Sequence, residues 1–222
     1  MTHLNEQPSG LRLPADLGLA GDAEQEFRDA CWQLIVKGSD DVDELVEYAA
    51  DGVPGLTVDQ ARRAASFLVQ ARRAQQATFG SEASEALRLT RAFHDLEAQG
   101  VLARQDWTCC GTCGVAEIGD DVDDLRDWRG YVFFHTQDTD QLAENGSTYL
   151  NYGIFWPSHV TEAEFEAMGE TERAVRYERE TVGLMQRVVV PTLERHDITV
   201  DWDGSLAQRI LLGNVSWYAP LP

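Results

Sequence analysis

Three of the four cysteines of this 222-residue sequence lie close together, in the run WTCCGTCG at residues 107–114. Cys110 and Cys113 are separated by two residues, a spacing that lets a tight turn direct both sulfurs to one point. Such a pair is half of a tetrahedral zinc site or the dithiol of a redox protein. The run therefore predicts either metal binding or thiol chemistry.

A tetrahedral zinc site needs further ligands, and the sequence has no second C-x-x-C pair and no H-x₃₋₅-H pair. His135, which ends the β-prone run GYVFFH (130–135), is the better third ligand if that strand end and the cysteine turn share one edge of a sheet. The alternative for His135 is a boundary histidine that donates to a backbone carbonyl. In extended backbone Cys109 would point away from Cys110 and fill apolar space. The predicted metal is zinc, and its predicted ligands are Cys110, Cys113, His135 and Asp138.

The same residues allow a second chemistry, in which Cys110 or Cys113 is a nucleophile and His135 its base, oriented by Gln137 or Asp138. The aspartates of residues 120–127 oppose this, because nearby carboxylates raise the pKa of a thiol, and they favour a bound cation instead. A thioredoxin-like fold is disfavoured because it needs a βαβ unit around the dithiol. The second functional class is therefore a thiol-dependent oxidoreductase or hydrolase.

Composition limits the partners that the protein can bind. The net charge is −20 and both halves of the sequence are acidic, so the surface should repel nucleic-acid phosphates and anionic lipids. No secretory signal and no apolar run of membrane-spanning length is present, which predicts a cytoplasmic protein whose clustered cysteines are ligands or reactive thiols. A basic protein partner would be attracted. A third functional class is thus an immunity-type or nucleic-acid-mimicking binding protein.

The spacing of apolar residues predicts which elements position these groups. Four helices are expected between residues 22 and 98, one of them with a capping box formed by Thr57 and Gln60. After Gly100 the pattern changes to about five short strands with helices between them. This order predicts an α+β fold, with a helical N-terminal part followed by a mostly antiparallel sheet. The predicted divisions are a tail at 1–21, a helical part at 22–80 and an α+β domain at 81–222.

Four segments together resemble the pattern of an uncharacterised bacterial family known as a domain of unknown function. They are CCGTCG (109–114), GYVFFHTQDTD (130–140), YLNYG (149–153) and VDWDG (200–204), within a match to approximately residues 80–218. The resemblance implies that six residues belong to one family signature: Cys109, Cys110, Cys113, His135, Gln137 and Asp138. It does not imply a reaction. The first functional class is an acidic intracellular accessory or regulatory protein with a zinc-binding Cys/His site.

Overall fold

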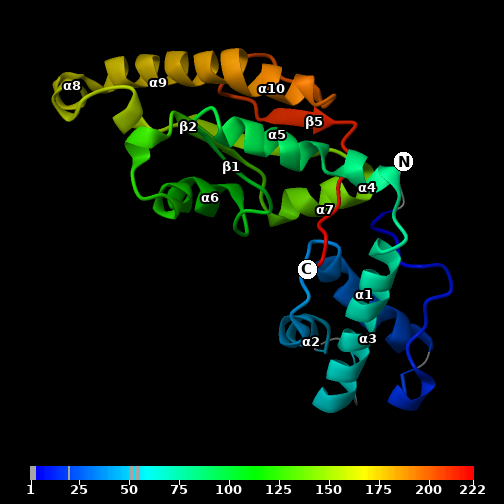
Figure 1. The fold of residues 1–222 in the computed structure, drawn as a ribbon. Coiled ribbons are helices and arrows are strands. Elements are labelled where there is room, and N and C mark those ends of the chain that lie inside the picture. Colours follow the sequence, from blue (N-terminus) through cyan, green and yellow to red (C-terminus); the bar gives the residue numbers. More distant parts are fainter. Residues whose placement is uncertain (1–3, 20, 51–52, 54–55) are drawn as a thin grey trace. The chain divides into compact units, whose positions relative to one another are not determined.

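The computed structural model describes residues 4–19, 21–50, 53 and 56–222. Its chain divides into two compact units, one of residues 1–85 with 218–222 and the other of residues 86–217. The helical unit therefore includes the last five residues of the chain, whereas the predicted division assigned these residues and 81–85 to the α+β domain. The elements of both units are labelled in Figure 1.

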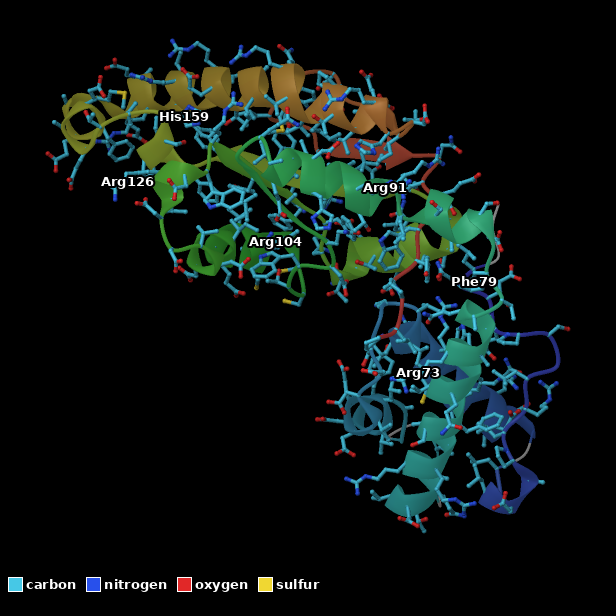
Figure 2. All side chains as sticks on the ribbon, viewed as in Figure 1. Arg73, Phe79, Arg91, Arg104, Arg126 and His159 are labelled. Carbon is cyan, nitrogen blue, oxygen red and sulfur yellow. The ribbon has the colours of Figure 1, made fainter. Side chains whose placement is uncertain are left out.

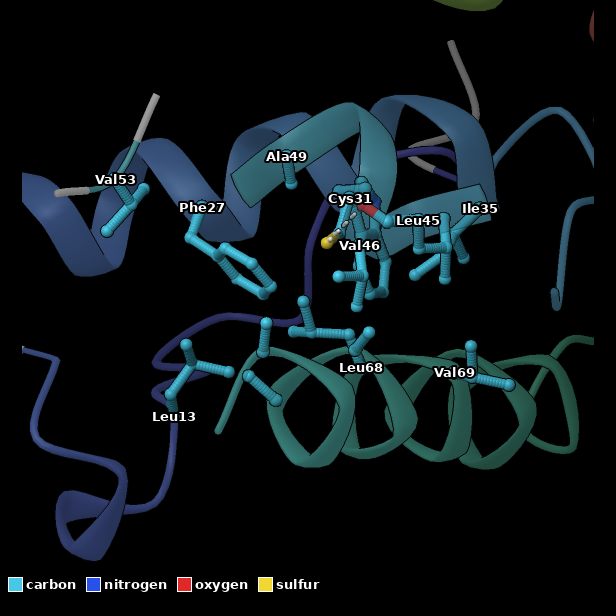
Figure 3. Close-up of a cluster of buried hydrophobic side chains, with 14 of the residues drawn as sticks. Leu13, Phe27, Cys31, Ile35, Leu45, Val46, Ala49, Val53, Leu68 and Val69 are labelled. Carbon is cyan, nitrogen blue, oxygen red and sulfur yellow. Dashed lines mark hydrogen bonds between the residues drawn. The ribbon is translucent and has the colours of Figure 1, made fainter. Parts of the chain in front are cut away.

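The helical unit is built on three helices that pack around one apolar core (Figure 3). The Thr57 side chain accepts the backbone N–H of Gln60, and the Gln60 side chain accepts the backbone N–H of Thr57, so the predicted capping box is confirmed. The elements are η1 (Ala15–Leu17), α1 (Gly21–Ile35), α2 (Val42–Ala50), α3 (Val58–Gln76) and α4 (Ser81–Ala86), which ends at the unit's boundary.

Segments from both ends of the chain meet at Arg72 of α3, which is fully buried. Its guanidinium donates to the carbonyl of Leu4 and lies over the rings of Trp32, Phe79 and Tyr218, with centroid distances of 6.0, 5.5 and 5.6 Å. Burial lowers the pKa of Arg72 to about 10, which leaves it charged at neutral pH. Cation–π contacts and this hydrogen bond therefore hold a residue that water would otherwise solvate.

The α+β unit contains a five-stranded sheet with the order β1-β2-β3-β5-β4. Strands β1 and β2 are parallel and the other neighbouring pairs are antiparallel, which confirms the predicted mostly antiparallel sheet and the α+β class. The elements are α5 (Arg88–Glu97), β1 (Val101–Arg104), α6 (Gly111–Glu117), η2 (Ile118–Asp121), η3 (Leu125–Asp127), β2 (Gly130–Phe133), α7 (Thr136–Asn145), β3 (Thr148–Ile154), η4 (Trp156–Ser158), α8 (Glu162–Ala167), α9 (Glu170–Leu184), the π-helical segment η5 (Met185–Val189), α10 (Val190–Arg195), β4 (Thr199–Asp201) and β5 (Ile210–Gly213).

Helices cover both faces of this sheet. Figure 1 shows α9 and α10 on one side and α6 and α7 on the other. Phe133 of β2 packs toward α6, while the next residue, Phe134, contacts Phe93 of α5 with ring centroids 5.9 Å apart. This alternation follows from the two-residue period of extended backbone. The cysteine loop therefore lies on the side of the sheet that Phe133 faces.

Candidate metal centre

The loop that carries the cysteines connects β1 to α6 and is anchored on the segment after β2. The backbone N–H of Trp107 donates to the carbonyl of Phe134 at 2.9 Å, and that of Thr136 donates to the carbonyl of Thr108 at 3.1 Å. Asp106 and Thr108 have φ angles of 52° and 59°, in the left-handed region that non-glycine residues adopt infrequently. The loop thus turns sharply twice just before the cysteines.

Two glycines allow α6 to lie closely against the sheet. A Cβ atom on Gly114 would lie 2.4 Å from the Phe133 ring, and a Cβ on Gly111 would lie 3.0 Å from Oδ1 of Asn151. Phe133 and Asn151 are register partners on β2 and β3. The glycines of the CCGTCG run therefore have a packing role, which is to bring the cysteine-bearing turn of α6 against the neighbouring strands β2 and β3.

The three clustered cysteines present their sulfurs to one another. The sulfurs of Cys109, Cys110 and Cys113 all lie within 4.8 Å of each other, and none of the three is in a disulfide. Cys109 is exposed, and the other two are partly exposed. Among the residues that the structure describes, this is the one group of three or more potential metal ligands. The cluster is therefore an accessible set of three sulfur ligands.

The expectation that Cys109 is an apolar filler pointing away from Cys110 is wrong. It rested on extended backbone through the loop, where neighbouring side chains alternate. The left-handed Thr108 redirects the chain directly before Cys109, and Cys110 becomes the N-cap residue of α6. The turn thus brings Cys109 to the same side as the pair that the C-x-x-C spacing predicts.

The two cysteines of the C-x-x-C pair differ in acidity. Polar interactions with the backbone N–H and then the thiol of Cys113 lower the pKa of Cys110, with smaller contributions from Cys109 and the Thr112 backbone. The pKa of Cys113 is raised to about 11, first by its hydrogen bond with Cys110 and then by Cys109. Cys110 is thus the sulfur that ionises first, and Cys113 keeps its proton as the donor.

His135 and Asp138 form a second cluster with Arg209. The Nδ1 atom of His135 accepts the backbone N–H of Asp138 at 3.3 Å and caps α7, so its proton is on Nε2, 3.0 Å from Oδ2 of Asp138. Arg209 donates two hydrogen bonds of 2.9 Å to the Asp138 carboxylate and lies over the Tyr149 ring at 4.7 Å. Both nitrogens of His135 therefore already have partners.

Two threonines connect α7 to the cysteine loop. The Thr136 hydroxyl donates to the carbonyl of Thr108 at 2.9 Å, and the Thr139 hydroxyl contacts Oδ1 of Asp106 at 2.6 Å. Their partners, Thr108 and Asp106, are the two residues of this loop with left-handed backbone. Sequence reasoning missed both threonines, although they lie in the HTQDT run that it singled out. It also missed Arg209, whose approach to Asp138 depends on the pairing of β3 with β5.

The predicted ligands are thus divided between two clusters. Cys110 and Cys113 lie with Cys109, while His135 and Asp138 contact each other and Arg209. The predicted zinc site with the four ligands Cys110, Cys113, His135 and Asp138 stays a prediction. Gln137 is exposed, and the fourth cysteine, Cys31, is buried in the core of the helical unit.

Comparison with known proteins places the chain in a family without assigning an activity. A model of the family described as Domain of unknown function (DUF6891) matches residues 20–220, nearly the whole chain. The chain belongs to this family. No curated protein and no solved structure matches it. Within the described part of the chain, every helix is too short or too polar to span a bilayer.

Proposed function

We propose that this DUF6891 protein is an accessory or regulatory protein whose cysteine loop binds zinc through Cys109, Cys110 and Cys113. The observation that carries the proposal is the convergence of three sulfur atoms within 4.8 Å of one another. Thiolates are the ligands that soft and borderline metal ions prefer, and three of them strongly favour zinc over magnesium or calcium. The acidic surroundings add to the attraction for a cation.

The spacing of the sulfurs is close to what a zinc ion requires. Zn–S bonds of about 2.3 Å at the tetrahedral angle place the sulfurs about 3.8 Å apart. The observed upper limit of 4.8 Å exceeds this by about one ångström, a difference that side-chain rotation at an exposed loop can close. The backbone turn that brings the three residues together needs no rearrangement for this.

Three thiolates leave the fourth position of a tetrahedral zinc ion to another ligand. His135 would supply it only by giving up its contact with Asp138 or its N-cap hydrogen bond. We therefore assign the fourth position to water or to a group from a partner. An open position of this kind suits a protein that exchanges zinc or senses it, because a closed four-residue site holds its metal more permanently.

Metal analysis of the full chain, purified under reducing conditions without chelator, tests the proposal. We expect about one equivalent of zinc, lost when Cys109, Cys110 and Cys113 are all replaced by serine. The matched control is Cys31→Ala, which removes a thiol from the core of the helical unit and should leave the zinc content unchanged. Cobalt substitution should give thiolate charge-transfer absorption in the parent chain and in the control, but not in the triple variant.

The single variant Cys109→Ser separates this site from one built on the C-x-x-C pair alone. We expect it to lower the zinc affinity by at least about a hundredfold, because it removes a direct ligand. Zinc below about a tenth of an equivalent, with freely titrating thiols at Cys109, Cys110 and Cys113, would overturn the proposal. Unchanged affinity in Cys109→Ser would overturn the three-sulfur site.

The difference in acidity within the pair supports a second candidate, a thiol oxidoreductase that uses Cys110 and Cys113. Cys110 would attack a disulfide substrate as the thiolate, form a mixed disulfide and release one substrate thiol. Cys113 would then attack the Cys110 sulfur, which forms the Cys110–Cys113 disulfide and releases the second substrate thiol. His135 does not fit as the base, because both its nitrogens are engaged. Redox titration of zinc-free protein against a dithiol–disulfide buffer tests this: a Cys110–Cys113 disulfide forming at cytosolic potentials supports it, and thiols that stay reduced contradict it.

A further inference from the structure

A cavity of about 850 Å³ opens beside the segment that joins β3 to α9, in the α+β unit. This volume lies within the range of about 300 to 1,000 Å³ that small-molecule sites occupy. Its lining includes Arg126 from η3 and His159 from the turn after η4, both labelled in Figure 2. None of the cysteines lines it, so this site is independent of the proposed zinc centre.

The apolar part of the cavity includes two aromatic rings that pack against each other. Trp156 and Phe165 meet with centroids 5.2 Å apart at an angle of 62°, and Tyr177 supports Trp156 at 6.0 Å. Arg173 holds Phe165 in place, since it stacks on the ring at 4.1 Å and donates two hydrogen bonds to the Phe165 carbonyl. These rings therefore form a preorganised wall of the cavity.

The polar part of the lining is rich in acceptors. Nε2 of His159 lies 2.6 Å from the carbonyl of Arg129, which only accepts, so Nε2 donates its proton to that carbonyl, while Nδ1 lies 3.9 Å from Oε2 of Glu180. Two carboxylates, Glu162 and Glu164, line the same cavity. Oε2 of Glu164 accepts from the backbone and hydroxyl of Thr161, which fixes this carboxylate at the start of α8. A ligand with N–H donors matches this lining.

The one cation in the lining, Arg126, is already neutralised. Its Nε donates to Oδ1 of Asp124 at 2.9 Å, and its Nη2 donates to Oδ2 at 2.6 Å. The same contact lowers the pKa of Asp124 to about 2 and keeps that carboxylate ionised across the neutral range. An anionic ligand would have to displace Asp124, whereas a cationic ligand meets two further carboxylates.

We infer that this cavity binds a small organic cation, an ammonium ion with an aromatic or alkyl body. The charged group lies against the Trp156 ring and the carboxylates of Glu162 and Glu164, and the apolar body packs on Phe165. Aromatic faces combined with acidic side chains are the usual means by which proteins recognise organic ammonium ions. The long-range field of a chain with a charge of −20 favours the same class of ligand.

Calorimetric titration of the full chain with three probes of similar size tests the inference. The probes are 2-phenylethylammonium, the neutral 2-phenylethanol and the anionic 3-phenylpropionate. We expect the ammonium ion to bind at least about tenfold more tightly than the alcohol, and the carboxylate not to bind. Equal affinity for the ammonium ion and the alcohol, tighter binding of the carboxylate, or no binding of any probe would overturn the inference.

Variants locate the binding in this cavity. Trp156→Leu keeps apolar volume but removes the aromatic face, and should weaken ammonium binding at least about tenfold. Glu162→Gln changes an exposed side chain and should weaken ammonium binding a few-fold. The matched control is Glu166→Gln, on the same helix but outside the lining, which should bind like the parent chain. An equal loss in Glu166→Gln, or no loss in the other two variants, contradicts the assignment.

Zinc removal distinguishes this site from the proposed metal centre. Probe binding should be the same before and after treatment with a chelator, and the same in the triple cysteine variant. Loss of probe binding on chelation would overturn the independent site. A lysine-containing peptide that binds at least about tenfold more tightly than the free ammonium ion would show instead that the cavity recognises protein side chains.

Discussion

The helical unit and the α+β unit both contain cysteine, in opposite surroundings. Cys31 in α1 is fully buried in the core of the helical unit, and its Sγ lies 3.9 Å from the carbonyl of Leu45 (Figure 3). Burial raises the pKa of Cys31 to about 12. In the α+β unit, hydrogen bonds from Cys113 lower the pKa of the partly exposed Cys110. The same side chain is inert in one unit and acidic in the other.

The difference follows from how each unit satisfies its polar groups. The helical unit encloses them, as with Arg72 among three aromatic rings and Glu24 paired with Arg28 at 2.9 Å. The α+β unit instead uses a polar network at the start of α7 to hold an exposed loop, since Thr136 and Thr139 bind the backbone and side chain before the cysteines. Buried polar groups stabilise the first unit, whereas those of the second also position reactive side chains.

The largest expected effect is on thiol reactivity. In zinc-free protein at pH 7.5, iodoacetamide should modify Cys110 at least about a thousandfold faster than Cys31, because three pKa units change the thiolate fraction by that factor. Cys113, with a pKa raised to about 11, should react more slowly than Cys110. Peptide mass spectrometry over a time course measures all these rates in one sample.

The pH dependence of the alkylation rates tests the direction in which the pKa of each cysteine is shifted. Lowering the pKa of Cys110 moves the midpoint of its rate profile below 9.0, while Cys113 reaches half its maximal rate only near pH 11. Cys113→Ala removes the thiol that donates to Cys110 and puts no other donor in its place, so the Cys110 midpoint should move back toward 9.0. Equal rates at Cys110 and Cys31, or a Cys110 midpoint above 9.0, would remove the contrast between the two units.

The second effect concerns the glycine that holds α6 on the sheet. Alanine normally stabilises a helix relative to glycine by about 1 kcal/mol, but a Cβ on Gly114 would meet the fully buried Phe133 ring at 2.4 Å. We expect Gly114→Ala to lower the free energy of unfolding by about 2 to 3 kcal/mol, because the ring cannot move without disturbing the core. Chemical denaturation followed by circular dichroism measures the change.

A nearby glycine supplies the control for this substitution. The nearest atom to a Cβ on Gly119 is 3.6 Å away, an ordinary contact, so Gly119→Ala should be neutral or stabilise by up to about 1 kcal/mol. If both variants unfolded at the same denaturant concentration as the parent chain, the close packing of α6 on Phe133 would be wrong. The role of glycine in the CCGTCG run would then lie elsewhere.

Much of the fold could be predicted because its signals are local. The Thr57 and Gln60 capping box and the β-prone run at 130–135 each depend on residues close in sequence, and both are present, the second as the strand Gly130–Phe133. One difference concerns the last of the four helices expected between residues 22 and 98, which the structure divides into α4 and α5 at Leu87. Local patterns thus predict the existence of elements better than their bounds.

The candidate site was harder to predict because its geometry depends on contacts between distant residues. The C-x-x-C spacing identifies Cys110 and Cys113, but Cys109 joins them only through the left-handed backbone of Thr108, for which threonine gives no signal. Likewise, Asp138 contacts Arg209 although the two residues are 71 positions apart in the sequence. No spacing rule predicts a pairing that a sheet topology creates.

The smallest of the three effects tests whether α7 positions the cysteine loop. Thr136→Val keeps the shape of the side chain but removes its hydrogen bond to the Thr108 carbonyl. We expect zinc affinity to fall about tenfold, because metal sites lose affinity when hydrogen bonds that support their ligands are removed. Thr136→Ser retains the hydroxyl and should restore the affinity. Competition with a chromophoric chelator measures both values.

The neighbouring signature residue Gln137 provides the comparison, because its side chain is exposed on the same helix. Gln137→Ala should bind zinc as the parent chain does, and all three variants should unfold at similar denaturant concentrations. A loss in Thr136→Ser as large as in Thr136→Val would mean that the hydroxyl does not act through the loop. A selective loss in the valine variant alone, with an altered cobalt spectrum, would tie the polar network at the start of α7 to the geometry of the three sulfurs.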